Sequence, residues 1–146
     1  MSAIYWDSML FAYFLEGNPV FGPMVRKIHQ DMILRGDTLC TSVFCLGELL
    51  TGPRKDGSVS GVDAVQRFFK SGAVEVLPFT SETADRFSQI RASLGVHPAD
   101  AIHLASAAVA GVELFLTNDK KLLRLQIPGI HFISGLDGRV LGNLAP

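Results

Sequence analysis

The stretch PADAIHLASAAVAGVELFLTND, residues 98–119, contains the clearest structural pattern in the chain. Pro98 suits the first position of a helix, where its missing N–H costs nothing. The run that follows predicts a helix through Ala110, stopped at Gly111. Apolar side chains cover nearly every side of this helix, which indicates that it is buried. Glu113–Thr117 is then predicted as a strand, with Asp119 just after it.

Strands and helices alternate along the rest of the chain. Strands are predicted at residues 3–6, 38–41, 73–77, 113–117 and 131–133, and helices at 8–15, 20–34, 42–50, 62–70, 81–94, 98–110 and 119–125. Residues 51–58 have the most loop-like composition. Such alternation is typical of a parallel α/β sandwich. With no internal linker or repeat, residues 1–146 are expected to form one domain.

The composition is rich in apolar side chains. Hydrophobic residues make up 48% of the chain and charged residues 18%, with a mean hydropathy of +0.30. A parallel sheet buried on both faces would absorb part of this surplus. An exposed patch covered by a partner subunit would absorb the remainder. We expect both.

The charge and the termini narrow the possible partners. The formal net charge is −1, whereas proteins that hold nucleic acid by charge alone carry a basic excess. Any RNA binding must therefore rest on local basic groups and bound metal. The chain lacks the basic leading segment of a secretion signal, and its longest apolar stretch, residues 101–116, is too short to span a bilayer. Cys40 and Cys45 lack the usual spacing of a zinc site. We expect a cytoplasmic protein with reduced cysteines and no membrane partner.

Four acidic residues, Asp7, Glu48, Asp100 and Asp119, occupy unusual places. Each has an ordinary explanation: helix capping, a favourable interaction with a helix dipole, or exposure to water. Together these explanations are weaker. Asp7 and Asp119 both follow predicted strands, and the carboxyl ends of the strands form the ligand crevice of an open parallel sheet.

The other two acids, Glu48 and Asp100, are expected on helices that leave little room for a polar face. Buried carboxylates are costly unless they are protonated, paired or bound to metal. No basic residue is placed to pair with all four. Hard oxygen ligands gathered without cations suit Mg²⁺ or Mn²⁺. Such ions support phosphodiester hydrolysis, because they activate water and stabilise charge on the attacking and leaving oxygens.

The aromatic and histidine residues near these acids have simpler expected roles. His103 lies one helical turn after Asp100. We expect it to be a buried histidine with satisfied hydrogen bonds rather than a residue of the site. Tyr5 and Trp6 flank Asp7 and are expected to pack in the core.

Four segments carry a family pattern that extends over nearly the whole chain. They are Tyr5-Trp-Asp7-Ser8, Gly47-Glu48-Leu49-Leu50-Thr51-Gly52, Pro98-Ala-Asp100-Ala-Ile-His-Leu-Ala105 and Leu116-Thr-Asn-Asp119-Lys-Lys-Leu122. In order and spacing they resemble the PIN domain, especially the VapC-type ribonuclease toxins of bacterial toxin–antitoxin pairs. The resemblance implies a three-layer α/β/α fold with a mostly parallel sheet. It also implies Mg²⁺- or Mn²⁺-dependent endoribonuclease activity, an antitoxin partner and a homodimer.

The same resemblance assigns roles to particular residues. Asp7, Glu48, Asp100 and Asp119 would be the catalytic residues that hold the metal. Ser8 and Thr117 lie next to them, where a hydroxyl could orient a ligand carboxylate or serve only in capping and turns. The basic residues that could line an RNA groove, or simply be solvated, are Arg54, Lys55, Lys120 and Lys121.

Two alternatives remain open at the level of sequence. One is a non-catalytic PIN-like module that binds RNA or a protein, in which the carboxylates are structural. The other is a PIN nuclease of RNA processing rather than a toxin.

Overall fold

A parallel sheet forms the centre of the molecule. The computed structural model describes residues 1–137 and 139–144, and within them five parallel strands pair in the order β3-β2-β1-β4-β5. The strands are β1 Ala3–Trp6, β2 Thr38–Ser42, β3 Glu75–Leu77, β4 Leu114–Leu116 and β5 Phe132–Ser134. Along the chain, β1 leads outward to β2 and β3, whereas β4 and β5 lie on its other side. The strand order therefore reverses between β1 and β4, and the crevice of an open parallel sheet lies beyond the carboxyl ends at that point.

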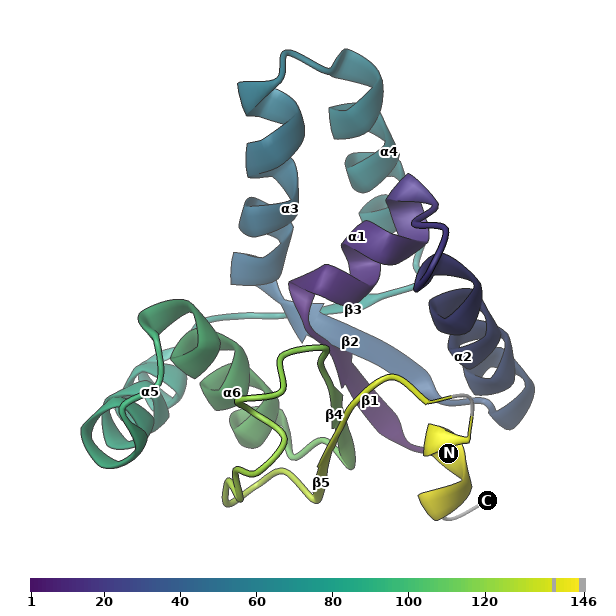
Figure 1. Cartoon of the computed structure of the whole chain (residues 1–146). Coiled ribbons are helices and arrows are strands. Elements are labelled where there is room, and N and C mark those ends of the chain that lie inside the picture. The colour runs from purple at the N-terminus through teal and green to yellow at the C-terminus, as the bar shows by residue number, and fades with distance from the viewer. Residues whose placement is uncertain (138, 145–146) are drawn as a thin grey trace.

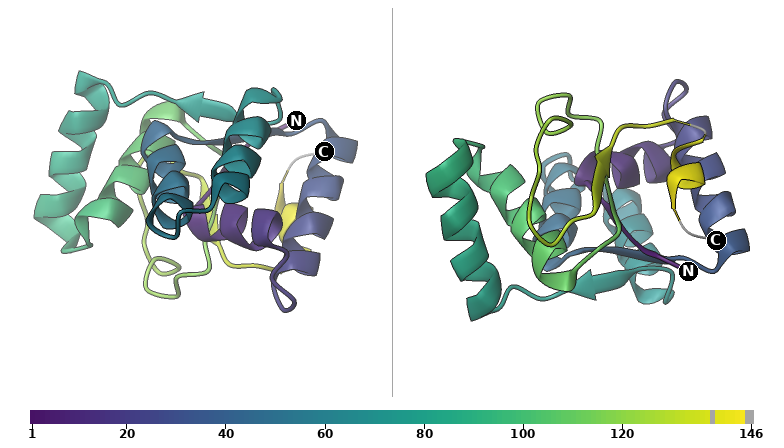
Figure 2. Two further views of the ribbon diagram at one scale, coloured as in Figure 1. Left: turned by 90° about the horizontal axis from the view of Figure 1, so that it is seen from above. Right: turned by 90° about the horizontal axis from the view of Figure 1, so that it is seen from below.

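Helices cover both faces of this sheet, so the predicted three-layer α/β/α architecture is confirmed. They are α1 Ser8–Glu16, α2 Gly22–Arg35, α3 Val43–Lys55, α4 Val59–Lys70, α5 Ser81–Leu94 and α6 Pro98–Ala110, with a short 3₁₀ helix η1 at Val140–Asn143. Helices α1 and α2 lie on one side of the sheet and α5 and α6 on the other, while the pair α3–α4 projects away from it (Figures 1 and 2).

The core is divided by the sheet into two clusters. Side chains alternate along a strand, so Ile4 and Trp6 pack toward α1 and α2, whereas Tyr5 packs with Phe115 toward α6. The three central strands are buried on both faces, as the apolar composition predicts. Cys40 and Cys45 are free, buried thiols. No helix in the described part of the chain is long and apolar enough to cross a membrane.

Apolar side chains remain exposed on several elements. The large ones are Met1, Met9, Val20, Ile33, Leu34, Val43, Val59, Phe79, Leu94, Leu123 and Phe132. They are spread over five of the helices, the loops and β5, so they do not by themselves mark one docking face.

Two predicted segments differ from the structure. Residues 51–58 were expected to form a loop, yet α3 continues to Lys55 with Pro53 inside it, and α4 begins at Val59. Residues 119–125 were expected to form a short helix, yet they form turns. Smaller differences affect element ends, such as the start of α2 at Gly22 instead of Val20. The predicted N-cap of α3 is confirmed, because the Ser42 hydroxyl accepts the Cys45 N–H.

Candidate active site

Asp7 occupies the carboxyl end of β1 and is held from three directions. Its side chain is buried, and its Oδ1 accepts the Ser8 N–H at 2.7 Å, which caps α1. Its Oδ2 accepts a hydrogen bond from the Thr117 hydroxyl at 2.8 Å. Its backbone N–H donates to the Leu116 carbonyl in β4. Capping, the ordinary explanation for Asp7, is therefore correct, and the carboxylate is also fixed at the edge between β1 and β4.

Thr117 and Asp119 continue this edge after β4. The buried Thr117 hydroxyl accepts the Asp119 N–H at 3.0 Å while it donates to Asp7. Asp119 Oδ1 in turn accepts the Lys121 N–H at 2.9 Å, so the carboxylate belongs to a tight turn. Asp7 and Asp119 are thus joined through one threonine hydroxyl. The contact from the Ser8 hydroxyl to Asp7 is longer, at 3.5 Å.

Asp100 lies in the first turn of α6 and is electrostatically coupled to both of these acids. Burial raises the pKa of its carboxyl above the usual value, and the negative charges of Asp7 and Asp119 raise it further. His103 and His97 act in the opposite direction. An aspartate feels such repulsion only where the charges lie close together. Three of the four predicted acids therefore share one negative field at the carboxyl edge of the sheet.

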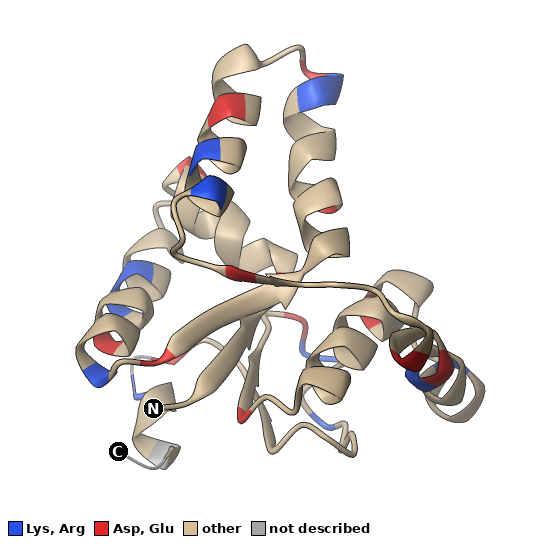
Figure 3. Cartoon of the chain, turned by 180° about the vertical axis from the view of Figure 1, so that it is seen from behind, with Lys and Arg blue, Asp and Glu red and all other residues tan. Residues whose placement is uncertain are grey.

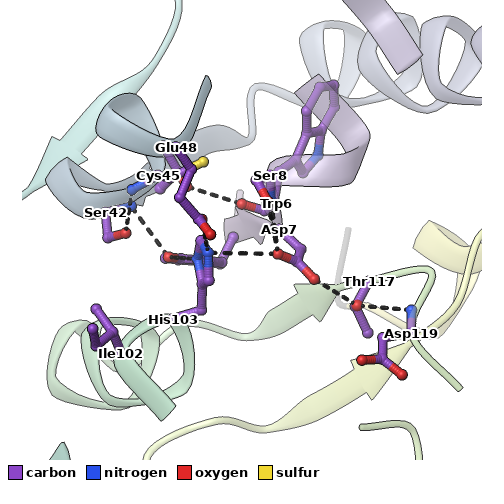
Figure 4. Close-up of polar contacts among 12 residues, drawn as sticks. Trp6, Asp7, Ser8, Ser42, Cys45, Glu48, Ile102, His103, Thr117 and Asp119 are labelled. Carbon is purple, nitrogen blue, oxygen red and sulfur yellow. Dashed lines mark hydrogen bonds and ion pairs between the residues drawn. The ribbon is translucent and has the colours of Figure 1, made fainter. Parts of the chain in front are cut away.

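Glu48 reaches this edge from α3 through His103. Glu48 Oε1 lies 2.6 Å from His103 Nε2, and Asp7 Oδ1 lies 3.6 Å from the same nitrogen. Figure 4 shows the imidazole between the two carboxylates. The Glu48 side chain is 31% exposed, and Cys45 is the one buried residue described on α3. The expectation that Glu48 lies on a largely buried helix was therefore wrong, since this helix projects from the sheet.

His103 is the residue of the site that the sequence did not identify. Its burial and its satisfied hydrogen bonds were predicted correctly: it is 2% exposed, and Nδ1 lies 2.6 Å from the Tyr5 hydroxyl. Its contact with two of the carboxylates was not predicted. The available signal was its position one turn after Asp100 in the same helix, which places both side chains on one face. That signal does not distinguish a site residue from a core residue.

The side chains fit a hard divalent cation by their chemistry. Asp7, Asp100 and Asp119 offer carboxylate oxygens, the ligand type that Mg²⁺ and Mn²⁺ prefer. Their mutual repulsion, seen in the raised pKa of Asp100, is what a cation would relieve. Within residues 1–137 and 139–144, however, no group of three or more His, Cys, Asp or Glu side chains is arranged to hold a metal as it stands.

The predicted RNA-binding residues lie in two places. Lys120 and Lys121 are exposed in the turn after Asp119, beside the acids. Arg54 and Lys55 are exposed in the last turn of α3. They lie six and seven residues beyond Glu48, about 10 Å farther along the helix axis. Figure 3 shows Lys and Arg distributed over several helices and loops with Asp and Glu between them, so the two groups stay separate.

Comparison with known proteins gives a family and a fold. The model of the PIN domain family matches residues 4–128. A chain of VapBC2 from Rickettsia felis, in a crystal structure bound to a DNA fragment from its promoter, superposes with a TM-score of 0.73 at 18% identity, covering 92% of this chain and 99% of that one. No curated protein matches the chain.

Two further solved structures share the fold. A chain of VapBC-5 from Mycobacterium tuberculosis, a member of the VapBC family of toxin–antitoxin systems, has a TM-score of 0.61 at 20% identity over 91% of this chain and 98% of that one. A chain of a toxin–antitoxin complex from Klebsiella pneumoniae has a TM-score of 0.59 at 17% identity over 87% and 94%. Identities this low establish the common fold alone.

Proposed function

The chain belongs to the PIN-domain family, and on that premise we propose that it is a metal-dependent endoribonuclease, the toxin of a type II toxin–antitoxin pair. Membership of the family supports a nuclease, which is a hydrolase. The observation that supports this site most directly is the edge at which the Thr117 hydroxyl joins the Asp7 carboxylate to the Asp119 amide, with Asp100 close enough to feel the charges of both acids. Three carboxylates that repel one another at the switch point of a parallel sheet suit a bound cation and a phosphate substrate better than a structural role.

The proposed mechanism is hydrolysis by water without a covalent intermediate. Asp7, Asp100 and Asp119 would hold Mg²⁺ or Mn²⁺, which supplies activation of water and neutralisation of phosphate charge when bound. Thr117 and the Ser8 N–H keep the Asp7 carboxylate in place. Glu48, whose Oε1 lies 2.6 Å from His103 Nε2, would use its other oxygen to bind the metal or to orient the attacking water. Water would add to phosphorus in line as the opposite P–O bond breaks, with one water proton lost to solvent and one proton taken up from solvent by the leaving oxygen.

The substrate is proposed to be RNA held by the two basic groups. Lys120 and Lys121 lie next to Asp119, so they are placed to contact phosphates that flank the cut. Arg54 and Lys55 would contact the strand farther along α3. Because the net charge is −1, these local contacts and the metal must outweigh the repulsion between the acids and the phosphate backbone.

The proposed protein partners are an antitoxin and a second copy of the chain. Similar folds occur in chains from toxin–antitoxin complexes. The exposed apolar side chains on α1, α2, α4 and α5 offer surface that a partner would cover. Failure of the product of a neighbouring gene to co-purify with the chain or to inhibit it would contradict the toxin assignment.

The decisive experiment is cleavage of a mixed RNA pool by the purified protein with Mg²⁺ or Mn²⁺ against EDTA. Asp100→Asn is the test variant, and Asp85→Asn on α5 is the matched control, because the Asp85 carboxylate is exposed and accepts a hydrogen bond from the neighbouring Gln89 side chain. We expect metal-dependent cutting by the wild type and the control, and none by Asp100→Asn with its fold intact.

The other outcomes separate the alternatives. RNA binding without cutting under either metal would favour the non-catalytic PIN-like module. Metal-dependent cutting that no antitoxin inhibits would favour a PIN nuclease of RNA processing. Full activity of Asp100→Asn, or of the wild type in EDTA, would overturn the proposed site.

A further inference from the structure

A buried chain of hydrogen bonds connects the core of the protein to Glu48. The Ser42 N–H lies 3.2 Å from the Tyr5 hydroxyl oxygen. The same oxygen lies 2.6 Å from His103 Nδ1, and His103 Nε2 lies 2.6 Å from Glu48 Oε1. These hydrogen bonds join four elements, because Ser42 is in β2, Tyr5 in β1, His103 in α6 and Glu48 in α3.

The direction of each hydrogen bond in this chain follows from the groups present. The Ser42 amide can only donate, so the Tyr5 oxygen accepts there. A phenol carries its proton at neutral pH, because its ordinary pKa is about 10. His103 Nδ1 lies 2.6 Å from the phenol oxygen, within reach of that proton, whereas the Ser42 N–H at 3.2 Å is itself a donor. With Nδ1 accepting the phenol proton, the neutral imidazole carries its own proton on Nε2.

The Nε2 proton is placed where two negative groups meet. It points to Glu48 Oε1 at 2.6 Å, and Asp7 Oδ1 lies 3.6 Å from the same nitrogen. Without a donor between them, these carboxylates would repel each other, and the partly exposed Glu48 would turn toward water. The N–H therefore keeps Glu48 at the edge of the sheet beside Asp7.

We propose that Tyr5 and His103 are positioning residues, in which the Tyr5 hydroxyl fixes His103 as the Nε2–H tautomer and His103 holds the Glu48 carboxylate in the site. The catalytic consequence rests on the proposed nuclease function, whereas the tautomer and the contact do not. A carboxylate that is already oriented loses less freedom when it engages water or metal, so the effect falls on the chemical step.

The packing role of each ring can be separated from its polar role. The Tyr5 ring is stacked on Phe115 with centroids 5.0 Å apart, and the His103 ring meets Phe44 edge-on at 5.6 Å. Tyr5→Phe keeps the stacked ring and removes only the hydroxyl. His103→Gln keeps a donor near Glu48, whereas His103→Leu has a similar size and none.

The first test locates the imidazole proton by ¹⁵N NMR of histidine-labelled, metal-free protein. We expect the proton on Nε2 in the wild type. It should remain there in Glu48→Ala, because Tyr5 still donates to Nδ1, and become shared between both nitrogens in Tyr5→Phe/Glu48→Ala. A proton on Nδ1 in the wild type or in Glu48→Ala would overturn the inference.

The second test measures kcat and KM for RNA cleavage with Mn²⁺. In Tyr5→Phe and His103→Leu we expect kcat to fall by about 10–100-fold, as for other residues that orient a ligand carboxylate, with KM nearly unchanged. His103→Gln should recover part of this loss. A rise in KM at constant kcat, or unchanged activity in all three variants, contradicts the positioning role. If the wild type cuts no RNA, the nuclease proposal fails, and the NMR experiment alone decides the tautomer and its cause.

Discussion

At the scale of single residues, the site depends on a few buried polar atoms that each serve two neighbours. The Thr117 hydroxyl donates to Asp7 and accepts from the Asp119 amide. The Tyr5 hydroxyl and the His103 ring have the same double role on the other side of Asp7. A buried polar group left without a partner lowers the free energy of unfolding by more than the net contribution of the original hydrogen bond. Stability and site geometry are therefore coupled at these positions.

Thr117→Val tests this coupling. Valine has nearly the same shape, so the change removes one fully buried hydroxyl and leaves Asp7 Oδ2 and the Asp119 N–H without it. We expect the free energy of unfolding to fall by about 1–3 kcal/mol, measured by urea denaturation. Thr51→Val is the control, because the exposed Thr51 hydroxyl only donates to the Gly47 carbonyl within α3. Equal losses in the two variants would contradict the coupling.

Asp100→Asn should stabilise the metal-free protein at neutral pH. The folded-state pKa of Asp100 is raised above its usual 3.8 by burial and by the charges of Asp7 and Asp119. Ionisation of Asp100 therefore lowers the free energy of unfolding. This loss is absent at a pH below the pKa of the unfolded state and complete at a pH above the raised pKa of the folded state. We expect a higher Tm for the variant at pH 7, and a gain that disappears as the pH falls toward 4.

The effect of bound metal on Tm gives a second test of the repulsion at Asp100. Saturating Mn²⁺ should raise the Tm of the wild type, because a ligand that binds only the folded state stabilises it. The same addition should raise the Tm of Asp100→Asn less. A Tm for the variant below that of the wild type at pH 7 without metal would show that the Asp100 carboxylate is not repelled in the fold.

At the scale of elements, the two segments predicted wrongly flank the site. Gly52 and Pro53 favour a turn locally, yet α3 continues through them because it packs along α4. Tertiary packing outweighs local propensity there. After β4, local hydrogen bonds prevail instead. The side chains of Thr117 and Asp119 accept nearby N–H groups, and a turn forms where a helix was predicted. The turn places the Asp119 carboxylate at the sheet edge.

Two helical glycines test the packing of the α3–α4 pair. A Cβ on Gly52 would meet no atom within 4 Å, whereas a Cβ on Gly61 would lie 2.9 Å from Ser58 Oγ and 3.0 Å from Pro53 Cβ. We expect Gly52→Ala to raise the free energy of unfolding by about 0.5–1 kcal/mol through helix propensity. Gly61→Ala should lose this gain or destabilise the protein, because it crowds the Pro53 ring. Equal gains in urea denaturation would show that α3 and α4 pack less closely.

At the scale of the whole molecule, charge is the property that most constrains RNA binding. The net charge is −1, and the Lys and Arg positions are distributed over several helices and loops (Figure 3). The molecule therefore cannot attract RNA by a broad positive face. If RNA is the substrate, as we propose, its binding depends on a few contacts close to the acids, and a few contacts release only a few counterions.

The dependence of RNA affinity on salt measures that number. With at most the four proposed basic residues in contact, the slope of log K against log salt should be no steeper than about −3, at roughly −0.7 for each neutralised phosphate on a single strand. Lys120→Gln/Lys121→Gln should weaken binding and make the slope shallower by about one unit or more. Lys27→Gln/Lys70→Gln changes two exposed lysines on α2 and α4 and is the matched control. A steep slope, or equal effects of the two pairs, would place the RNA elsewhere.

Local patterns in the amino-acid sequence were sufficient to predict the alternation of strands and helices, the buried character of α6 and the four acids as candidate site residues. These features are local: a period along the chain, a capping residue such as Ser42, or an acid at the end of an apolar run. The sequence could not give the strand order β3-β2-β1-β4-β5, which brings the ends of β1 and β4 together. It also could not give the place of His103, whose partners Tyr5 and Glu48 lie 98 and 55 residues away in the chain. Such contacts form only when distant helices and strands pack together. They depend on how those elements are aligned, which the local periodicity of the sequence does not encode.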